Sequence, residues 1–209
     1  MSKFQIVTFY TEDTPYEAEA HKMRDSANAL GYKVSIYQMP NLGDWAANTR
    51  HKAHVVYEEW QEIDMPVVWV DADAIIQKRL WWFEYPWFDY ACHIHKMSWS
   101  DHTPRPSKPP ELNLVRSGTL FFGRGAGALL KDWAKFSEEG DSWDQYHLWE
   151  AMQKNWDSIE MEQLPMSYVT RNNNSNTGPS RDGVLCEDAV VLHTRGSKRF
   201  RKQINEPHP

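Results

Sequence analysis

Two aspartates separated by one residue, Asp71 and Asp73, directly follow the apolar run from Val67 to Val70. Such a run predicts a strand that is covered on both faces. Ligands of open α/β sheets bind at the carboxyl edge of the strands, and two crowded carboxylates repel each other unless a divalent cation relieves the repulsion. Oxygen ligands favour Mg²⁺ or Mn²⁺. The pair therefore predicts a metal site that would bridge a diphosphate and neutralise its charge; the alternative is a turn and helix cap.

The segments before this pair predict two parallel strands joined by a helix. Residues 4–8 alternate and are rich in β-formers, which indicates a first strand. Thr14 and Pro15 are typical of an N-cap and a first helical position, and Gly31 is typical of a helix end. A second strand follows at Val34 and Ile36, so the chain begins with a βαβ unit.

The rest of the chain continues to alternate helices and strands. Apolar spacing predicts helices over residues 49–63, 128–137 and 143–155, and strands over residues 90–95, 119–122 and 189–193. Proline-rich residues 98–112 and asparagine-rich residues 171–183 predict loops. We therefore expect one α/β domain spanning residues 1–209, with a twisted, mostly parallel, Rossmann-like central sheet flanked by helices.

Composition and charge restrict the function classes. The formal net charge of −6 disfavours generic nucleic-acid binding, although the C-terminal end is locally basic. Only Cys92 and Cys186 are present, which fits a reducing compartment. The N-terminal residues lack the apolar core of a signal peptide, and no apolar stretch has the length of a membrane span. We expect a cytoplasmic protein without a membrane span, and the sequence leaves the oligomeric state open.

Several short motifs occur in an order that resembles a known family. Asp71-Ala72-Asp73 is followed by Ser117-Gly118-Thr119, by Asp144-Gln145 and by His193-Thr194-Arg195-Gly196-Ser197-Lys198. Over most of the chain this order resembles the GT-A glycosyltransferases, especially the glycogenin-like and bacterial galactosyltransferase-like retaining group. The final motif of that group is His-x-x-Gly-x-x-Lys. Here Lys198 comes one residue early, and Arg199 stands at the position of the family's lysine.

The resemblance implies a metal-dependent, retaining transfer of a sugar from a nucleoside diphosphate, with UDP favoured, to an acceptor hydroxyl. It implies that Asp71, Asp73 and His193 bind Mn²⁺ or Mg²⁺. Arg195 and Lys198 would contact the diphosphate, with the arginine after Lys198 as the alternative to it. A solvated basic tail is the other interpretation of these cations.

The resemblance also assigns a nucleoside site. Thr8, Tyr10 and Thr11, at the end of the first strand, would hold the nucleoside, and Tyr10 can stack on its base. Asn48 and Lys52 lie on the helix that precedes the Asp71 strand and would face the nucleotide. The alternative is that both belong to the polar outer face of that helix.

Asp144 and Gln145, at the start of a predicted helix, are assigned to the donor sugar. By resemblance, one of them holds the sugar or stabilises positive charge that develops at its anomeric carbon. Asp144 could instead be only an N-cap. A retaining enzyme of this kind needs no strong base on the acceptor, because the leaving phosphate can take the proton.

Two other motifs suggest different chemistry but have simpler explanations. The glycines from Gly123 to Gly127 have the spacing G-x-G-x-G rather than that of a dinucleotide-binding loop, so we interpret them as a turn. His93 and His95 share one face of a predicted strand without a third ligand nearby, so packing or hydrogen bonding explains them better than zinc.

Two rival functions remain. A sugar-1-phosphate nucleotidyltransferase should carry a basic, glycine-rich loop after its first strand, and residues 8–16 contain no glycine, arginine or lysine. A non-catalytic module that binds sugar nucleotides is the second rival. The donor is expected to be a nucleoside diphosphate sugar, and the acceptor could be a glycan, a lipid-linked sugar, a protein or a modified DNA base.

Overall fold

The computed structural model describes residues 3–98, 111–172, 180, 183–194 and 200. Six strands form the central sheet: β1 (Gln5–Thr11), β2 (Val34–Met39), β3 (Val67–Val70), β5 (Tyr90–Ser98), β6 (Glu111–Phe122) and β7 (Met161–Gln163). Their order is β2-β1-β3-β6-β5-β7. Strand β6 runs antiparallel to both of its neighbours, whereas the other pairs are parallel.

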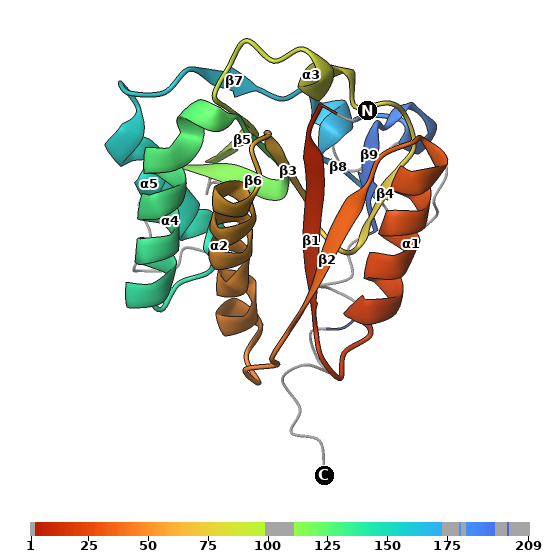
Figure 1. Ribbon diagram of the computed structural model, residues 1–209, viewed down its shortest axis with the longest axis horizontal. Helices are drawn as coiled ribbons and strands as arrows, with labels where there is room; N and C mark the ends of the chain where they lie inside the picture. The colour runs from red at the N-terminus through yellow and green to blue at the C-terminus, as the bar shows by residue number, and fades with distance from the viewer. Residues whose placement is uncertain (1–2, 99–110, 173–179, 181–182, 195–199, 201–209) are drawn as a thin grey trace.

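Two unlike layers cover this sheet (Figure 1). Helices α2 (Trp45–Glu62), α4 (Gly127–Glu139) and α5 (Asp144–Asn155) lie on one side. On the other side lie α1 (Tyr16–Ala29) and a small sheet of β4 (Ala74–Ile76), β9 (Val191–His193) and β8 (Thr170–Arg171), with the short α3 (Trp81–Glu84) at one end. Three 3₁₀ turns, Arg124–Ala126, Met166–Tyr168 and Cys186–Asp188, complete the described elements.

The sheet separates two apolar cores, and alternation along each strand decides which core a residue joins. In β3, Val67 and Trp69 face the core under α2, α4 and α5, whereas Val68 and Val70 face the core under α1 and the small sheet. All four side chains are buried. A strand that contributes to both cores must be apolar throughout, which explains the continuous apolar run that precedes Asp71.

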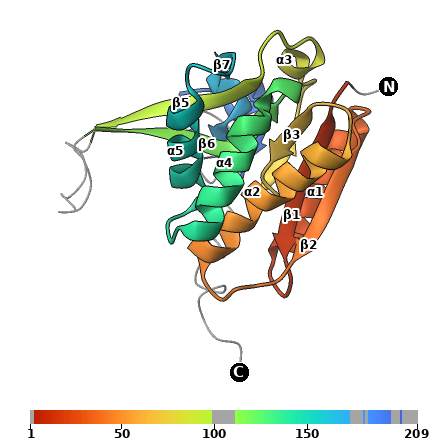
Figure 2. The ribbon, with the colours of Figure 1, turned by 60° about the vertical axis from the view of Figure 1, so that its left-hand side comes forward.

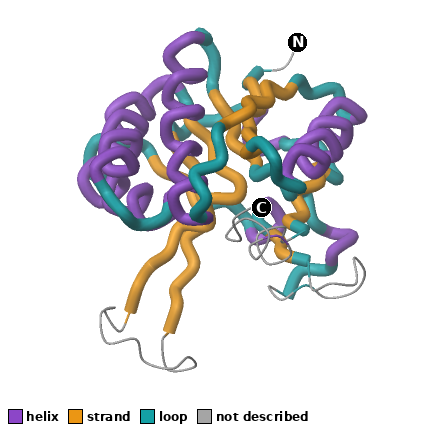
Figure 3. Tube along the Cα trace, turned by 90° about the horizontal axis from the view of Figure 1, so that it is seen from below, coloured by secondary structure: helices purple, strands orange, loops and turns teal. Residues whose placement is uncertain are grey.

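Strands β5 and β6 form a long antiparallel hairpin that extends beyond the helical layers (Figure 2). Seen from below, the two strands leave the body of the domain side by side (Figure 3). The predicted loop over residues 98–112 is therefore wrong at both ends, since Ser98 closes β5 and Leu112 lies in β6. Residues 99–110 between them lie outside the described part of the chain.

The predicted α/β class, with a mostly parallel sheet flanked by helices, is confirmed. Helix α1 begins at Tyr16, one residue later than predicted, and the Thr14 hydroxyl accepts a hydrogen bond from the Tyr16 amide at 3.4 Å. Helix α2 begins at Trp45 rather than at residue 49, because the Asp44 side chain caps it by accepting from the Ala47 amide at 2.8 Å. The sequence did not indicate β4, α3, β7 or β8.

None of the helices in the described ranges combines the length and the apolar character that a membrane span requires.

Candidate active site

A pocket of about 320 Å³ opens where β1 and β3 end, between the first turns of α2 and α5 and the end of β9. Its polar side chains come from β1, α2, β6, α5, β8 and β9 and from the segment after β3. The lining residues are Phe9, Tyr10, Thr11, Tyr16, Trp45, Asn48, Thr49, Lys52, Trp69, Asp71, Ala72, Asp73, Arg116, Ser117, Gly118, Asp144, Gln145, Val169, Arg171 and His193. Its volume is within the range of small-ligand sites.

Asp71, Asp73 and His193 come together at one end of this pocket. Each offers one possible ligand atom, and the three atoms lie within 4.8 Å of one another. The Asp71 amide donates to the Gly118 carbonyl at 2.8 Å, and the Thr194 amide donates to the Asp73 carbonyl at 2.8 Å. These backbone bonds fasten the turn after β3 to β6 on one side and to the end of β9 on the other.

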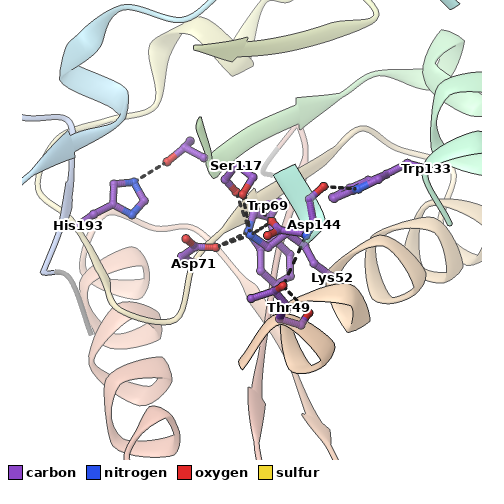
Figure 4. A network of polar contacts seen from close by, with 10 residues as sticks. Thr49, Lys52, Trp69, Asp71, Ser117, Trp133, Asp144 and His193 are labelled. Atoms are coloured by element: carbon purple, nitrogen blue, oxygen red, sulfur yellow. Dashed lines mark hydrogen bonds and ion pairs between the residues drawn. The ribbon is translucent and has the colours of Figure 1, made fainter. Parts of the chain in front are cut away.

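The His193 ring lies against a glycine. A Cβ atom at Gly118 would lie 2.6 Å from His193 Cε1, so only glycine leaves room for the ring in this position. On the next residue of β6, the Thr119 hydroxyl lies 3.1 Å from His193 Nε2 (Figure 4). The Ser117-Gly118-Thr119 motif therefore orients the imidazole by close packing and by one hydrogen bond.

Lys52 connects the Asp71 carboxylate with the Asp144 carboxylate. Its ammonium lies 2.9 Å from Asp71 Oδ1 and 2.7 Å from Asp144 Oδ2, and it also donates to the Ser117 hydroxyl at 3.0 Å (Figure 4). The lysine side chain is buried. The interpretation of Lys52 as part of a polar outer helix face is therefore wrong, because the side chain points into the pocket.

Asp71 and Asp144 are each held by a further donor. The Trp69 indole donates to Asp71 Oδ1 at 2.8 Å, which is the same oxygen that Lys52 contacts. The Ser117 hydroxyl donates to Asp144 Oδ2 at 2.6 Å. Asp144 is the first residue of α5, but its carboxylate forms no N-cap bond and instead faces Lys52.

These contacts set the charge states of the site. Burial raises the pKa of Asp71, but the charge of Lys52 and the hydrogen bonds from Lys52 and Trp69 outweigh it and hold the pKa below its usual value. Burial lowers the pKa of His193, and Asp71 opposes this only in part. Burial would lower the pKa of Lys52, yet Asp144 and Asp71 raise it above its usual value. The site thus contains ionised aspartate and lysine together with a neutral imidazole, which is the form that binds metals.

Aromatic side chains also line the pocket. Tyr10, Tyr16 and Trp45 line it together with Thr11. Asn48 also lines it, but its amide donates to Asn41 at 2.9 Å and its side-chain oxygen accepts from the Leu42 amide at 2.7 Å. Asn48 therefore holds the loop that leads into α2 and so helps to place Trp45.

Of the other predicted site residues, some line the pocket and some do not. Gln145 lines the pocket beside Asp144, whereas Thr8 is fully buried and does not line it. Arg195, Lys198 and Arg199 lie outside the described residues.

The lining residues that sequence reasoning missed include four large polar or aromatic ones: Trp45, Trp69, Arg116 and Arg171. The Arg116 guanidinium donates to the Val169 carbonyl at 3.3 Å, which ties β6 to the segment before β8. A signal was present for two of the four. Asp44, a typical N-cap residue, directly precedes Trp45. Trp69 lies two residues before Asp71, so its side chain is on the same side of the strand.

The motifs set aside in the sequence have structural roles. None of the glycines from Gly123 to Gly127 lines the pocket, and a Cβ at Gly127 would lie 2.8 Å from the Trp60 ring. His93 is buried, and its Nδ1 lies 2.8 Å from the Leu164 carbonyl. Among the described residues, neither His93 nor His95 joins a cluster of three possible metal ligands.

No protein-family model and no curated protein sequence matches the chain. Among solved structures, a glycosyltransferase involved in the glycosylation of the major capsid of PBCV-1 aligns with a TM-score of 0.65 at 13% identity, over 97% of this chain and 96% of that one. The glycosyltransferase GlyE of Streptococcus pneumoniae TIGR4 aligns with a TM-score of 0.45 at 12% identity, over 80% of this chain and 46% of that one. The first likeness shows that the fold is one that a glycosyltransferase uses.

Proposed function

We propose that the chain is a glycosyltransferase that moves a sugar from a nucleoside diphosphate, UDP by preference, to an acceptor hydroxyl. The observation that carries this proposal is the convergence, in the lining of a partly aromatic pocket, of Asp71 and Asp73 with His193, which lies more than a hundred residues later in the sequence. The fold, shared with a glycosyltransferase, supports it.

The three side chains suit a divalent cation. Two carboxylates and a neutral imidazole are a donor set for Mn²⁺ or Mg²⁺. Within the described residues, both side-chain contacts of Asp71 fall on Oδ1, which leaves Oδ2 for an ion. Close packing against Gly118 and the contact with the Thr119 hydroxyl fix the imidazole, as partners of metal-binding histidines commonly do. A bound ion would stabilise the negative charge of the leaving diphosphate.

Different residues of the pocket lining suit the two ends of a nucleotide sugar. The rings of Tyr10 and Trp45 can stack on the base, and Thr11 lies beside them. The network of Lys52, Asp144 and Ser117 offers fixed donors and acceptors to the sugar hydroxyls. Gln145 adds an amide to this end. Arg195 and Lys198, which follow His193 closely, are proposed to contact the diphosphate, with the residue after Lys198 as the alternative.

In the proposed reaction, the acceptor oxygen bonds to the anomeric carbon as the bond from that carbon to the diphosphate oxygen breaks. The acceptor proton passes to the leaving phosphate. Asp144 is already bound by Lys52 and Ser117, which suits a carboxylate that stabilises positive charge at the sugar rather than one that removes a proton. Because no side chain here is assigned as a base for the acceptor, we propose that the reaction retains the configuration at the anomeric carbon.

Hydrolysis of UDP-sugars, in which water replaces the natural acceptor, tests whether the protein cleaves the sugar from UDP. The natural acceptor need not be known. We expect slow release that needs Mn²⁺ or Mg²⁺, stops with a chelator and is lost in Asp73→Asn. A binding module would hold UDP with the metal but release none from a UDP-sugar. A nucleotidyltransferase would instead form UDP-sugar and pyrophosphate from UTP and a sugar 1-phosphate, and that product would overturn the proposal.

A further inference from the structure

Exposed aromatic side chains gather far from the pocket. Among the described residues eight large apolar side chains are exposed, and four of them belong to the short segment from residue 81 to residue 87: Trp81, Trp82, Tyr85 and Trp87. We call these four side chains the aromatic platform. Figure 1 shows α3 at the upper edge of the molecule, near the N-terminus, whereas β1 and β2 end at the lower edge, which holds the pocket. No platform residue lines the pocket, so the proposed function does not account for them.

Buried side chains in the same segment fix the platform in place. Phe83 is fully buried and stacks on Phe121 with ring centroids 5.3 Å apart. Phe88, also buried, contacts both Trp82 and Trp87, with centroid distances of 6.4 and 5.7 Å. The exposed rings are therefore part of a preformed surface, and a partner would lose little conformational entropy on binding it.

Two cations contact platform rings. The Lys3 ammonium lies 3.4 Å from the centroid of the Tyr85 ring, and the Arg79 guanidinium lies 4.5 Å from that of Trp81. The Glu84 carboxylate is buried and accepts from Arg79 at 2.8 Å. Lysine and arginine side chains donate hydrogen bonds but accept none. The platform thus combines amphipathic rings with hydrogen-bond donors.

We propose that the aromatic platform docks the protein on the surface of a lipid bilayer. Tryptophan and tyrosine are enriched at the level of the lipid headgroups, where the ring enters the apolar region and its polar atom stays in water. Lys3 and Arg79 would donate to lipid phosphates while their aliphatic stems lie along the rings. A bilayer surface would therefore contact both the rings and the two cations of this region.

The same features fit other partners less well. A glycan would need acceptors as well as donors for its hydroxyls, but the cations only donate and Glu84 is already occupied. A nucleic acid would need a strong basic surplus, whereas the whole chain carries a net charge of −6. A zwitterionic bilayer needs no such surplus. Docking by this end would leave the pocket facing water.

Vesicle sedimentation with the full-length protein tests the proposal. Vesicles of phosphatidylcholine, with and without phosphatidylglycerol, should sediment the protein, and brominated acyl chains should quench part of its tryptophan fluorescence. The combined variant Trp81→Ala/Tyr85→Ala/Trp87→Ala should bind more weakly by on the order of tenfold per ring removed, because each ring loses apolar burial. Unchanged melting temperatures would show that the exposed substitutions leave the fold intact.

The matched control removes exposed apolar side chains from the pocket end. Leu42→Ala/Tyr146→Ala changes two such residues, one in the loop before α2 and one in the first turn of α5, and vesicle binding should stay at the wild-type level. The proposal is overturned if the wild type does not sediment with vesicles, or if control and platform variants weaken binding equally. It is also overturned if light scattering shows a dimer that only the platform variant dissociates, because the occupant would then be a second copy of the chain.

Discussion

The close contact between Gly118 and His193 allows the proposed metal site to be disturbed without removing any charge. Gly118 does not have a positive φ, so alanine fits its backbone and only the added methyl group matters. That Cβ would lie 2.6 Å from His193 Cε1, 3.0 Å from Nδ1 and 3.1 Å from Nε2. Carbon atoms in contact lie about 3.5–4.0 Å apart, so the ring must move by about 1 Å.

A movement of that size exceeds the tolerance of a metal site, since ligand distances hold to about ±0.2 Å. In Gly118→Ala we expect Mn²⁺ affinity to fall by about 10- to 100-fold and metal-dependent UDP release to fall with it. Overpacking should cost about 1–3 kcal/mol of folding free energy, which lowers the melting temperature by about 2–4 °C per kcal/mol in a domain of this size.

A double-mutant cycle isolates the contact. Once His193→Ala has removed the ring, Gly118→Ala should have almost no further effect on the melting temperature or on Mn²⁺ affinity. Calorimetric titration and thermal unfolding of the four proteins provide both readouts. Wild-type Mn²⁺ affinity in Gly118→Ala, or full additivity of the two substitutions, would refute the idea that Gly118 positions His193 for a metal.

Three further predictions follow from burial and charge. Lys52→Met leaves Asp144 buried without its cation, so thermal unfolding should show that the free energy of unfolding falls by about 3–5 kcal/mol. UDP release should fall as well, and wild-type stability would contradict the role of Lys52 as a bridge between the two carboxylates. Trp45→Ala should weaken UDP binding in calorimetry by about 1–3 kcal/mol, which is the usual contribution of an aromatic ring stacked on a base. Mn²⁺ affinity should not change, and an equal loss of UDP and Mn²⁺ affinity would argue against a base site at Trp45. Burial raises the pKa of the Cys92 thiol to about 12 and Cys186 is also buried, so neither should react with a thiol reagent at mildly alkaline pH until the protein unfolds.

The sequence predicted those parts of the site that depend on strand periodicity. Asp71 directly follows an apolar strand, and the sheet edge then decides where its side chain lies. His193 could be placed only through its resemblance to a family motif, because no local pattern relates it to Asp71. Their proximity results from the pairing of β4 with β9, in which Ala74 lies opposite His193.

Other features were missed, or were placed only through the family resemblance. The cap at Asp44 was visible in the sequence, yet the helix was predicted to start four residues too late and Trp45 was missed. Strand β4 has three residues, too few to show a period. Helical periodicity alone makes Lys52 a surface residue, and only the resemblance assigned it to the nucleotide. It is buried because Asp71 and Asp144 compensate its charge from two other elements.

Titration of the protein with Mn²⁺, followed by calorimetry or by the electron paramagnetic resonance of the free ion, tests the central claim most directly. We predict one tight site per chain that strengthens when UDP is present. It should be lost in Asp73→Asn and in His193→Ala, while both variants keep a folded far-ultraviolet spectrum. Equal Mn²⁺ binding by the wild type and both variants, or no binding by the wild type with UDP, would contradict the account.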